Sequence, residues 1–161
     1  MSVPFGLKKS AAMVILRSGD QFLLLKRSKN PNRDKYTPVG GKLEPFEDPY
    51  TAALRETEEE TGFKLDAIRY VGYIVESSPT KYNWHVYCYL ADIPYQDPPF
   101  CDEGTLEWIH KDQIAQLNIP ATDYVIYDYV TEGRPFALNA VMDEELNIVT
   151  MVEEIANEKL I

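Results

Sequence analysis

Short apolar runs separated by turn residues recur along the chain and predict a structure built mainly of strands. Residues 10–17 and 22–27 are two such runs, nearly continuous in apolar side chains and separated by Ser-Gly-Asp. Glycine between two short apolar runs is typical of a β-hairpin, and continuous apolar sequence is typical of strands covered on both faces. The N-terminal part of the chain is therefore predicted to form a central antiparallel hairpin.

A second strand pair is predicted at residues 68–76 and 82–93, which are rich in aromatic and β-branched residues. Pro79 lies in the short polar segment between them, so the two strands should run antiparallel. Side chains alternate between the two faces of a strand. In the second strand one face therefore carries Trp84, Val86, Cys88 and Leu90, and the other carries His85, Tyr87 and Tyr89.

The remaining segments predict shorter elements. Residues 94–104 contain three prolines and should form a loop. Thr122 and Gly133 bracket a predicted helix over residues 123–132. The other predictions are a strand at 105–109, one or two helical turns at 111–117, a hairpin of 136–142 with 147–151, and a helical or frayed tail at 153–161.

The clearest helix signal covers residues 49–61. Asp48 at the N-cap and Pro49 at the first helical position predict its start. Gly62 predicts its end, because glycine is the usual residue just past a helix C-terminus. The stripe of this helix that is predicted to pack on the core consists of Tyr50, Leu54, Thr57 and Thr61.

Three glutamates lie on a different stripe of this helix, because at 3.6 residues per turn Glu56, Glu59 and Glu60 fall on the same side. Glu58 points away from them. Like charges on one stripe repel each other, and acids late in a helix oppose its dipole. Since Mg²⁺ favours carboxylate oxygens together with water and substrate phosphates, the stripe predicts a divalent-cation site, with a solvated acidic face as the alternative.

Composition and charge limit the partners of the protein. The 161 residues suffice for one domain with a real core, residues 1–161, and not for two. A net charge of −10 argues against nucleic acid or an anionic membrane surface as a partner, and the sequence has neither a long apolar segment nor a signal-peptide pattern. Two cysteines, Cys88 and Cys101, are interpreted as reduced thiols. These features favour a cytoplasmic protein, either monomer or homodimer.

The spacing of polar residues in and just before the predicted helix at 49–61 resembles the signature of a known family. Residues 41–63 read Gly-x5-Glu-x7-Arg-Glu-Thr-x-Glu-Glu-x-Gly-Phe. This pattern resembles the Nudix box, Gly-x5-Glu-x7-Arg-Glu-U-x-Glu-Glu-x-Gly-U, in which U is a bulky aliphatic residue. Every charged and glycine position matches, and fixed offsets make the signature specific. Thr57 stands where an aliphatic residue is usual, on the predicted core face, so this departure concerns packing more than chemistry.

The resemblance to Nudix enzymes implies an α/β (α+β) fold, an α/β/α sandwich around a mixed β-sheet. It also implies hydrolysis of a nucleoside diphosphate linked to another moiety, with Mg²⁺ as cofactor and Mn²⁺ as a substitute. Carried over by position, the metal ligands are Glu56, Glu59, Glu60 and the backbone carbonyl of Gly40. Glu56 and Glu59 are the catalytic carboxylates, with Glu56 the first choice as general base, and Arg55 completes the catalytic set by orienting them together with Glu47.

Outside the box the chain resembles the 8-oxo-dGTP diphosphatase-like branch of Nudix enzymes, through less specific motifs. The resemblance rests on Lys26-Arg27, on Gly40-Gly41-Lys42, on residues 102–108 and on the predicted helix near Asp123. It implies that Glu103 completes the metal site, that Arg27 contacts phosphate and that Asp123 lies beside the purine. The substrate-binding residues implied in this way are Arg27, Thr37, Gly41, Lys42 and Asp123.

Two of these residues also fit a purely structural role, and a third departs from the branch. A loop carboxylate in an acid-rich segment accounts for Glu103 equally, and an acid that stabilises the helix dipole accounts for Asp123. Thr37-Pro38 stand where close purine readers of this branch carry Asn-Gly. A hydroxyl lacks the paired planar donor and acceptor of an amide, so only modest discrimination among purines is expected.

Three functional hypotheses follow from the resemblance. The first is an Mg²⁺-dependent enzyme that hydrolyses a nucleoside triphosphate, such as 8-oxo-dGTP, to the monophosphate and pyrophosphate. The second keeps the fold and replaces the substrate by ADP-ribose, a dinucleotide polyphosphate or another nucleotide-linked pyrophosphate. The third is a sensing domain that binds nucleotides without turnover, which the intact box disfavours. In each case the partner is a small nucleotide.

Overall fold

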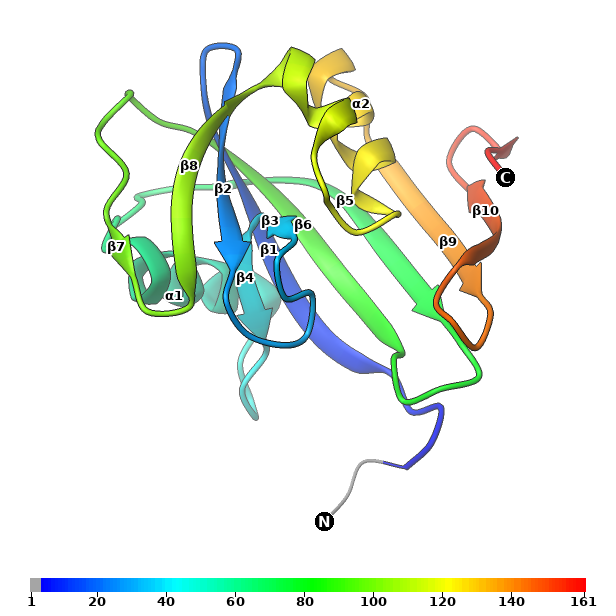
Figure 1. Ribbon diagram of the computed structural model, residues 1–161. Coiled ribbons are helices and arrows are strands. Elements are labelled where there is room, and N and C mark those ends of the chain that lie inside the picture. The colour runs from blue at the N-terminus through cyan, green and yellow to red at the C-terminus, as the bar shows by residue number, and fades with distance from the viewer. Residues whose placement is uncertain (1–3) are drawn as a thin grey trace.

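A single mixed β-sheet forms the centre of the computed structural model, which describes residues 4–161 (Figure 1). The strands follow the order β11-β10-β9-β5-β6-β1-β2-β8-β7, while β3 pairs with β2 and β4 pairs with β1. Their bounds are β1 (Lys9–Ser18), β2 (Gln21–Arg27), β3 (Tyr36–Thr37), β4 (Val39–Lys42), β5 (Arg69–Ser77), β6 (Trp84–Asp92), β7 (Phe100–Cys101), β8 (Gly104–His110), β9 (Phe136–Met142), β10 (Ile148–Glu153) and β11 (Glu158–Lys159).

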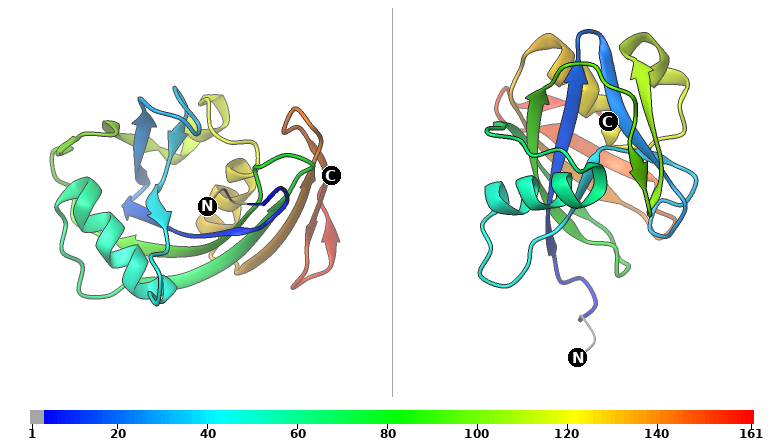
Figure 2. Two further views of the ribbon diagram at one scale, coloured as in Figure 1. Left: turned by 90° about the horizontal axis from the view of Figure 1, so that it is seen from below. Right: turned by 90° about the vertical axis from the view of Figure 1, so that its left-hand side faces the viewer.

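Two α-helices cover opposite faces of this sheet, α1 (Pro49–Thr61) on one and α2 (Asp123–Glu132) on the other (Figure 2). A 3-10 helix, η1 (Lys111–Gln116), leads from β8 towards α2. The sheet is mixed because β1 runs parallel to β6, and β5 runs parallel to β9, whereas the other pairs are antiparallel. The predicted fold class is confirmed.

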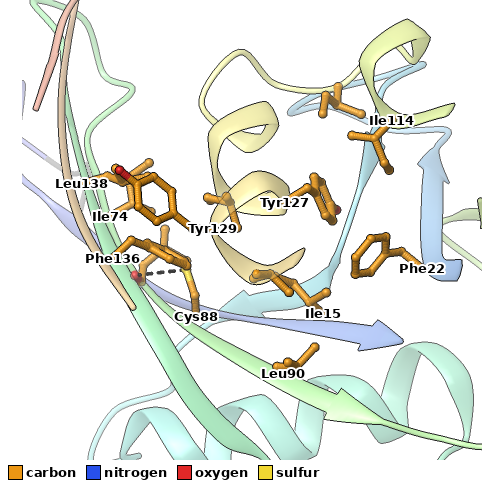
Figure 3. Packing of buried hydrophobic residues seen from close by; sticks show 14 of the residues in the cluster. Ile15, Phe22, Ile74, Cys88, Leu90, Ile114, Tyr127, Tyr129, Phe136 and Leu138 are labelled. Carbon is orange, nitrogen blue, oxygen red and sulfur yellow. Dashed lines mark hydrogen bonds between the residues drawn. The ribbon is translucent and has the colours of Figure 1, made fainter. Parts of the chain in front are cut away.

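The core under α2 is apolar and aromatic (Figure 3). Two tyrosines of α2 pack against aromatic rings on different strands. The Tyr127 ring lies 5.1 Å from that of Phe22 on β2, and the Tyr129 ring lies 5.9 Å from that of Phe136 on β9. From the sheet, β6 contributes Val86, Cys88 and Leu90 to this core, which confirms the face predicted from its alternation. The packing fixes α2, and with it the residue at its N-terminus, above the middle of the sheet.

On the opposite face α1 approaches the sheet through small residues. Ala52 and Ala53 are fully buried, and Thr57 and Thr61 are buried beside them. The predicted core stripe was therefore wrong in part: Tyr50 is 39% exposed. Two alanines allow the helix axis to lie close to the sheet. The helix therefore turns its alanines, rather than its larger apolar residues, towards the sheet.

The ends of α1 form as the sequence predicts. Asp48 accepts a hydrogen bond from the Thr51 backbone N–H at 2.8 Å, which satisfies one of the free amides of the first turn. Gly62 adopts φ of 77°, and its N–H donates to the Glu58 carbonyl at 2.7 Å. The helix that carries the glutamate stripe is thus capped at both ends.

The other predicted elements are largely confirmed. The hairpins β1/β2, β5/β6 and β9/β10 are all present, and α2 has the predicted bounds, although Thr122 makes no capping bond with its side chain. The 94–104 loop contains the short strand β7. In residues 4–161 no helix is long and apolar enough to cross a membrane.

The tail was predicted to be helical or frayed, and this was wrong. Buried Glu153 accepts hydrogen bonds from the backbone N–H groups of Ile155 at 2.6 Å and Ala156 at 3.0 Å. These bonds turn the chain back, so that β11 pairs with β10 through Val152 and Lys159. A side chain that caps a turn inside the fold leaves no periodic signal in the sequence.

We expect Thr57→Val to keep or raise the free energy of unfolding, by up to about 1 kcal/mol. The buried Thr57 hydroxyl donates to the Ala53 carbonyl at 2.8 Å, a bond that bends helices more than it stabilises them. Thr61→Val is the matched control. The Thr61 hydroxyl also accepts a hydrogen bond from the Phe63 N–H at 3.0 Å, so the Thr61→Val variant should lose about 1 kcal/mol of unfolding free energy. Urea unfolding of both variants measures the difference, and equal losses would contradict the packing role of Thr57.

Candidate active site

A cavity of about 420 Å³ opens beside β4, between the end of α1 and the start of α2. Its walls come from β1, β3, β4, β5, β6, both α-helices and the loops that follow β2 and β7. Nine of the eleven site residues expected from the sequence line it: Arg27, Thr37, Gly40, Gly41, Lys42, Glu56, Glu60, Glu103 and Asp123. Segments far apart in the sequence thus share one cavity.

Two glycines of β4 allow α1 to approach this wall. A Cβ atom on Gly41 would overlap the carboxylate of Glu56, so the glycine leaves the space that this carboxylate occupies. Gly40 has φ of 155°, and a Cβ there would collide with the backbone carbonyl of Ala12 on β1. The paired glycines are therefore required by close approach on both sides of the strand.

Arg55 holds the loop, β4 and the helix together. Its guanidinium donates to both oxygens of Glu47, at 2.7 and 2.8 Å, and to the Lys42 carbonyl at 3.2 Å. The same group donates to Glu56 at 2.9 Å and to Glu59 at 3.3 Å. The bonds from Arg55 lower the pKa of Glu47 to about 2, so Glu47 stays ionised throughout the neutral range.

Three carboxylates gather at the β4 end of the cavity: Glu56, Glu60 and Glu103. Glu60 is 6% exposed. Burial, and then the charges of Glu103 and Glu56, raise the pKa of Glu60 to about 8, against the bond from the Gly40 N–H. Burial also raises the pKa of Glu56, although Arg55 opposes the shift. Arg27 lies 3.7 Å from Glu103.

These residues fit a divalent cation in their chemistry. Glu60 Oε2 is buried without a hydrogen-bond partner, and the acids around it place negative charge where a cation would be stabilised. Among residues 4–161 no three acidic, histidine or cysteine side chains already surround one point as metal ligands. Arg55 holds Glu56 and Arg27 lies near Glu103, so binding of a cation would require these side chains to rotate.

Glu59 and Arg55 do not line the cavity, unlike the other expected site residues. Glu59 is exposed, and its carboxylate lies on the Arg55 guanidinium at 3.3 Å. The metal and catalytic roles expected for Glu59 stay predictions. In this arrangement its contact with Arg55 links it to Glu56, which shares the same nitrogen.

A second acidic cluster occupies the opposite end of the cavity. Strand β5 lies three strand spacings from β4, through β1 and β6, which is roughly 14 Å. There Glu76 of β5 and Asp123 of α2 are buried, with exposed fractions of 6% and 5%. Burial raises the pKa of Glu76 to about 7, and burial together with the Glu76 charge raises the pKa of Asp123 to about 8.

Sequence reasoning missed Glu76. The signal was present, since Glu76 follows buried Ile74 by two positions and therefore faces inward, where an acid is unusual. Thr37 lines the same cavity, with its hydroxyl oxygen buried and without a partner. Tyr82 and Trp84 also line the cavity, so their rings are available to contact a ligand.

The buried acids predict a stability that depends on pH. Because the pKa of Asp123 is raised, the folded state loses stability as pH rises from about 4 towards 8. Asp123→Asn should therefore be more stable than the wild type at pH 8, by on the order of 2 kcal/mol, and the gain should shrink towards pH 5. Asp128→Asn, at an exposed position on the same helix, should follow the wild type. Thermal unfolding across this range tests the prediction, and parallel curves for all three proteins would contradict it.

Comparison with known proteins identifies the family. The NUDIX domain family model matches residues 6–130. Diphosphoinositol polyphosphate phosphohydrolase 3-alpha from Homo sapiens is 38% identical over 86 residues, which cover 52% of this chain and 51% of that protein. A Mus musculus protein of the same name is 37% identical over 86 residues, with the same coverage of both chains. The chain thus spans about half the length of the curated relatives that it matches.

Solved structures agree in fold. The mutator MutT protein from Bacillus halodurans has a TM-score of 0.78 at 22% identity, over 91% of this chain and 98% of that chain. The NUDIX domain of Shewanella oneidensis NrtR, crystallised with ADP ribose, has a TM-score of 0.68 at 18% identity, over 80% of this chain and 90% of that chain. At these identities the likeness is evidence for the fold alone. Together with the family match over residues 6–130 it leads to one conclusion: the chain belongs to the Nudix hydrolase family.

Proposed function

We propose that this protein is a divalent-cation-dependent pyrophosphohydrolase that cleaves a nucleoside triphosphate into the monophosphate and pyrophosphate. The observation that carries the proposal is the cavity itself. It holds the box carboxylates Glu56 and Glu60 at one end, and a polar, cation-poor site around Asp123 at the other. Its volume of about 420 Å³ lies within the range of small-molecule sites, roughly 300–1,000 Å³.

The residues of the β4 end supply the chemistry of hydrolysis. Glu56, Glu60, Glu103 and the Gly40 carbonyl would hold the cation, which neutralises phosphate charge and polarises the phosphorus–oxygen bond when bound. Water attacks a phosphorus of the α–β linkage, the bridging phosphorus–oxygen bond breaks, and the monophosphate and pyrophosphate separate. Glu56 accepts the proton of the water, since burial raises its pKa and Arg55 fixes its position.

Basic residues in the cavity suit one phosphate chain. In the described part of the chain, the basic side chains that line the cavity are Arg27 and Lys42. A ring that carries many phosphates needs more cations than these, and it would also place anions beside buried Glu76 and Asp123. The charge distribution thus favours a nucleotide over the substrate class in the name of the human relative.

The experiment that tests the proposal is a product-resolved screen of the purified protein with Mg²⁺. The panel includes nucleoside triphosphates, 8-oxo-dGTP, ADP-ribose, a dinucleotide polyphosphate and a diphosphoinositol polyphosphate. Release of pyrophosphate and monophosphate from a nucleoside triphosphate is the expected outcome. Exclusive turnover of another member of the panel would overturn the proposed substrate, and binding of nucleotides without turnover would indicate a sensing domain.

Glu60→Gln should reduce turnover by about 100-fold or more, because it removes a carboxylate ligand from the proposed cation site while keeping the side-chain volume. Glu58→Gln is the control. Glu58 lies on the same helix, is exposed, and contacts Lys64 at 3.7 Å, so this variant should retain activity. Initial rates at limiting Mg²⁺ provide the comparison, and near-normal turnover of Glu60→Gln would refute the assignment.

Thr37→Asn should change the selectivity between dGTP and 8-oxo-dGTP more than it changes turnover. The Thr37 hydroxyl is buried in the cavity wall without a partner, and an amide would add a paired donor and acceptor. The wild type should show a modest preference, and Thr37→Val, which removes the hydroxyl, should leave the ranking nearly flat. Matched kcat/KM values for both substrates decide it. A strong wild-type preference that survives both substitutions would place base recognition elsewhere.

A further inference from the structure

Glu76 lies in the middle of the sheet and faces the cavity. On β5 it pairs with Trp84 of β6 on one side and with Ala140 of β9 on the other, so its backbone is fixed by two neighbouring strands. Its side chain shares the face of Ile74, beneath α2, and is 6% exposed. The first residue of α2, Asp123, lines the same end of the cavity.

The two carboxyls have few partners within the protein: the Thr122 hydroxyl is shared between them, and its hydrogen bond to Glu76 opposes the rise in the Glu76 pKa. Glu76 accepts from the Tyr82 hydroxyl at 3.5 Å, and Asp123 accepts from the Thr122 hydroxyl at 3.4 Å. Both distances exceed the usual 2.7–2.8 Å of such bonds. None of the ion pairs in residues 4–161 involves either acid. Buried carboxyls normally accept several hydrogen bonds, so this end of the cavity retains acceptors for a ligand.

We propose that Glu76 is a specificity-determining residue, which together with Asp123 forms a carboxyl pair that recognises a base edge carrying adjacent N–H donors beside a carbonyl. The inference rests on the proposed function, because it assigns the nucleoside end of the same cavity. A guanine-type edge has this arrangement, with a ring N–H and an amino group next to a carbonyl oxygen. The Watson–Crick edge of adenine has one amino group beside an unprotonated ring nitrogen.

The charge state of the pair suits this edge near neutral pH. Burial raises the pKa of both acids, and the charge of Glu76 raises that of Asp123 further. The titratable or charged groups that face them are Tyr82, Cys88, Tyr127 and Lys35. Close to neutral pH at least one of the two carboxyls is therefore protonated. The protonated carboxyl donates to the carbonyl of the base, and the ionised carboxyl accepts from its N–H groups.

The pair also excludes anionic groups. Once either buried acid ionises, it repels a phosphate or carboxylate at this end of the cavity. A neutral base is accepted there, while its phosphate chain extends towards Arg27 and the β4 end. The direction of the bound nucleotide follows from this difference in charge.

The test measures binding of dGMP and dAMP to the full chain by calorimetry in metal-free buffer, so that it does not depend on turnover. The wild type should bind dGMP more tightly, and the dGMP/dAMP affinity ratio should fall by about tenfold between pH 6.5 and 8.5 as the pair loses its proton. Glu76→Gln, which leaves one titrating carboxyl, should flatten that fall. Glu76→Met, which removes the polar group, should reduce the ratio by roughly 10- to 100-fold.

Glu107→Gln is the matched control. Glu107 also has a buried oxygen without a partner, but it lies on β8 and outside the cavity lining, so this variant should reproduce both the ratio and its pH course. Thermal unfolding of each variant checks that it is folded. If nucleotides are hydrolysed while Glu76→Gln and Glu76→Met keep the wild-type ratio and pH course, the inference on Glu76 is overturned and the proposed function stands. If the wild type neither binds nor hydrolyses any nucleotide, both are overturned.

Discussion

The Arg55 guanidinium is the contact on which the geometry of the site depends. It joins the Lys42 carbonyl at the end of β4, Glu47 in the following loop, and two glutamates of α1. Without it, these three carboxylates would lie close together with little to offset their repulsion. A planar group with five donors can satisfy several carboxylates at once, which a lysine cannot do. The paired glycines of β4 are the steric counterpart, because they let Glu56 lie against the strand that Arg55 secures.

How much of the site could be predicted depended on whether the signal was local. The bounds of α1 follow from Asp48 and Gly62, and the box glutamates follow from fixed spacing, so both were readable from a single stretch of sequence. Glu76 carried only the weak local signal of its spacing from Ile74, since its importance depends on β5 lying between β6 and β9. Only that position buries its side chain and turns an ordinary strand glutamate into an unusual one.

The errors in the fold have the same origin. Tyr50 resembles a core residue by periodicity, but two neighbouring alanines let the helix approach the sheet and leave Tyr50 outside. The tail lacks the alternation of a strand, and it is shaped instead by Glu153, whose carboxylate accepts the backbone amides of the turn. In both cases a tertiary contact outweighed the local pattern, as is common for weakly patterned segments.

The two ends of the cavity require different things from a ligand. At the β4 end, Glu60 has an unpartnered oxygen among further acids, so a cation is needed there. At the α2 end, Glu76 and Asp123 have few hydrogen-bond partners and no ion pair, so hydrogen-bond donors are needed there. A metal–nucleotide complex brings positive charge to the first end and the N–H groups of a base to the second. A polyphosphorylated ring would bring anions to both, and with a net charge of −10 the protein has few cations with which to receive them.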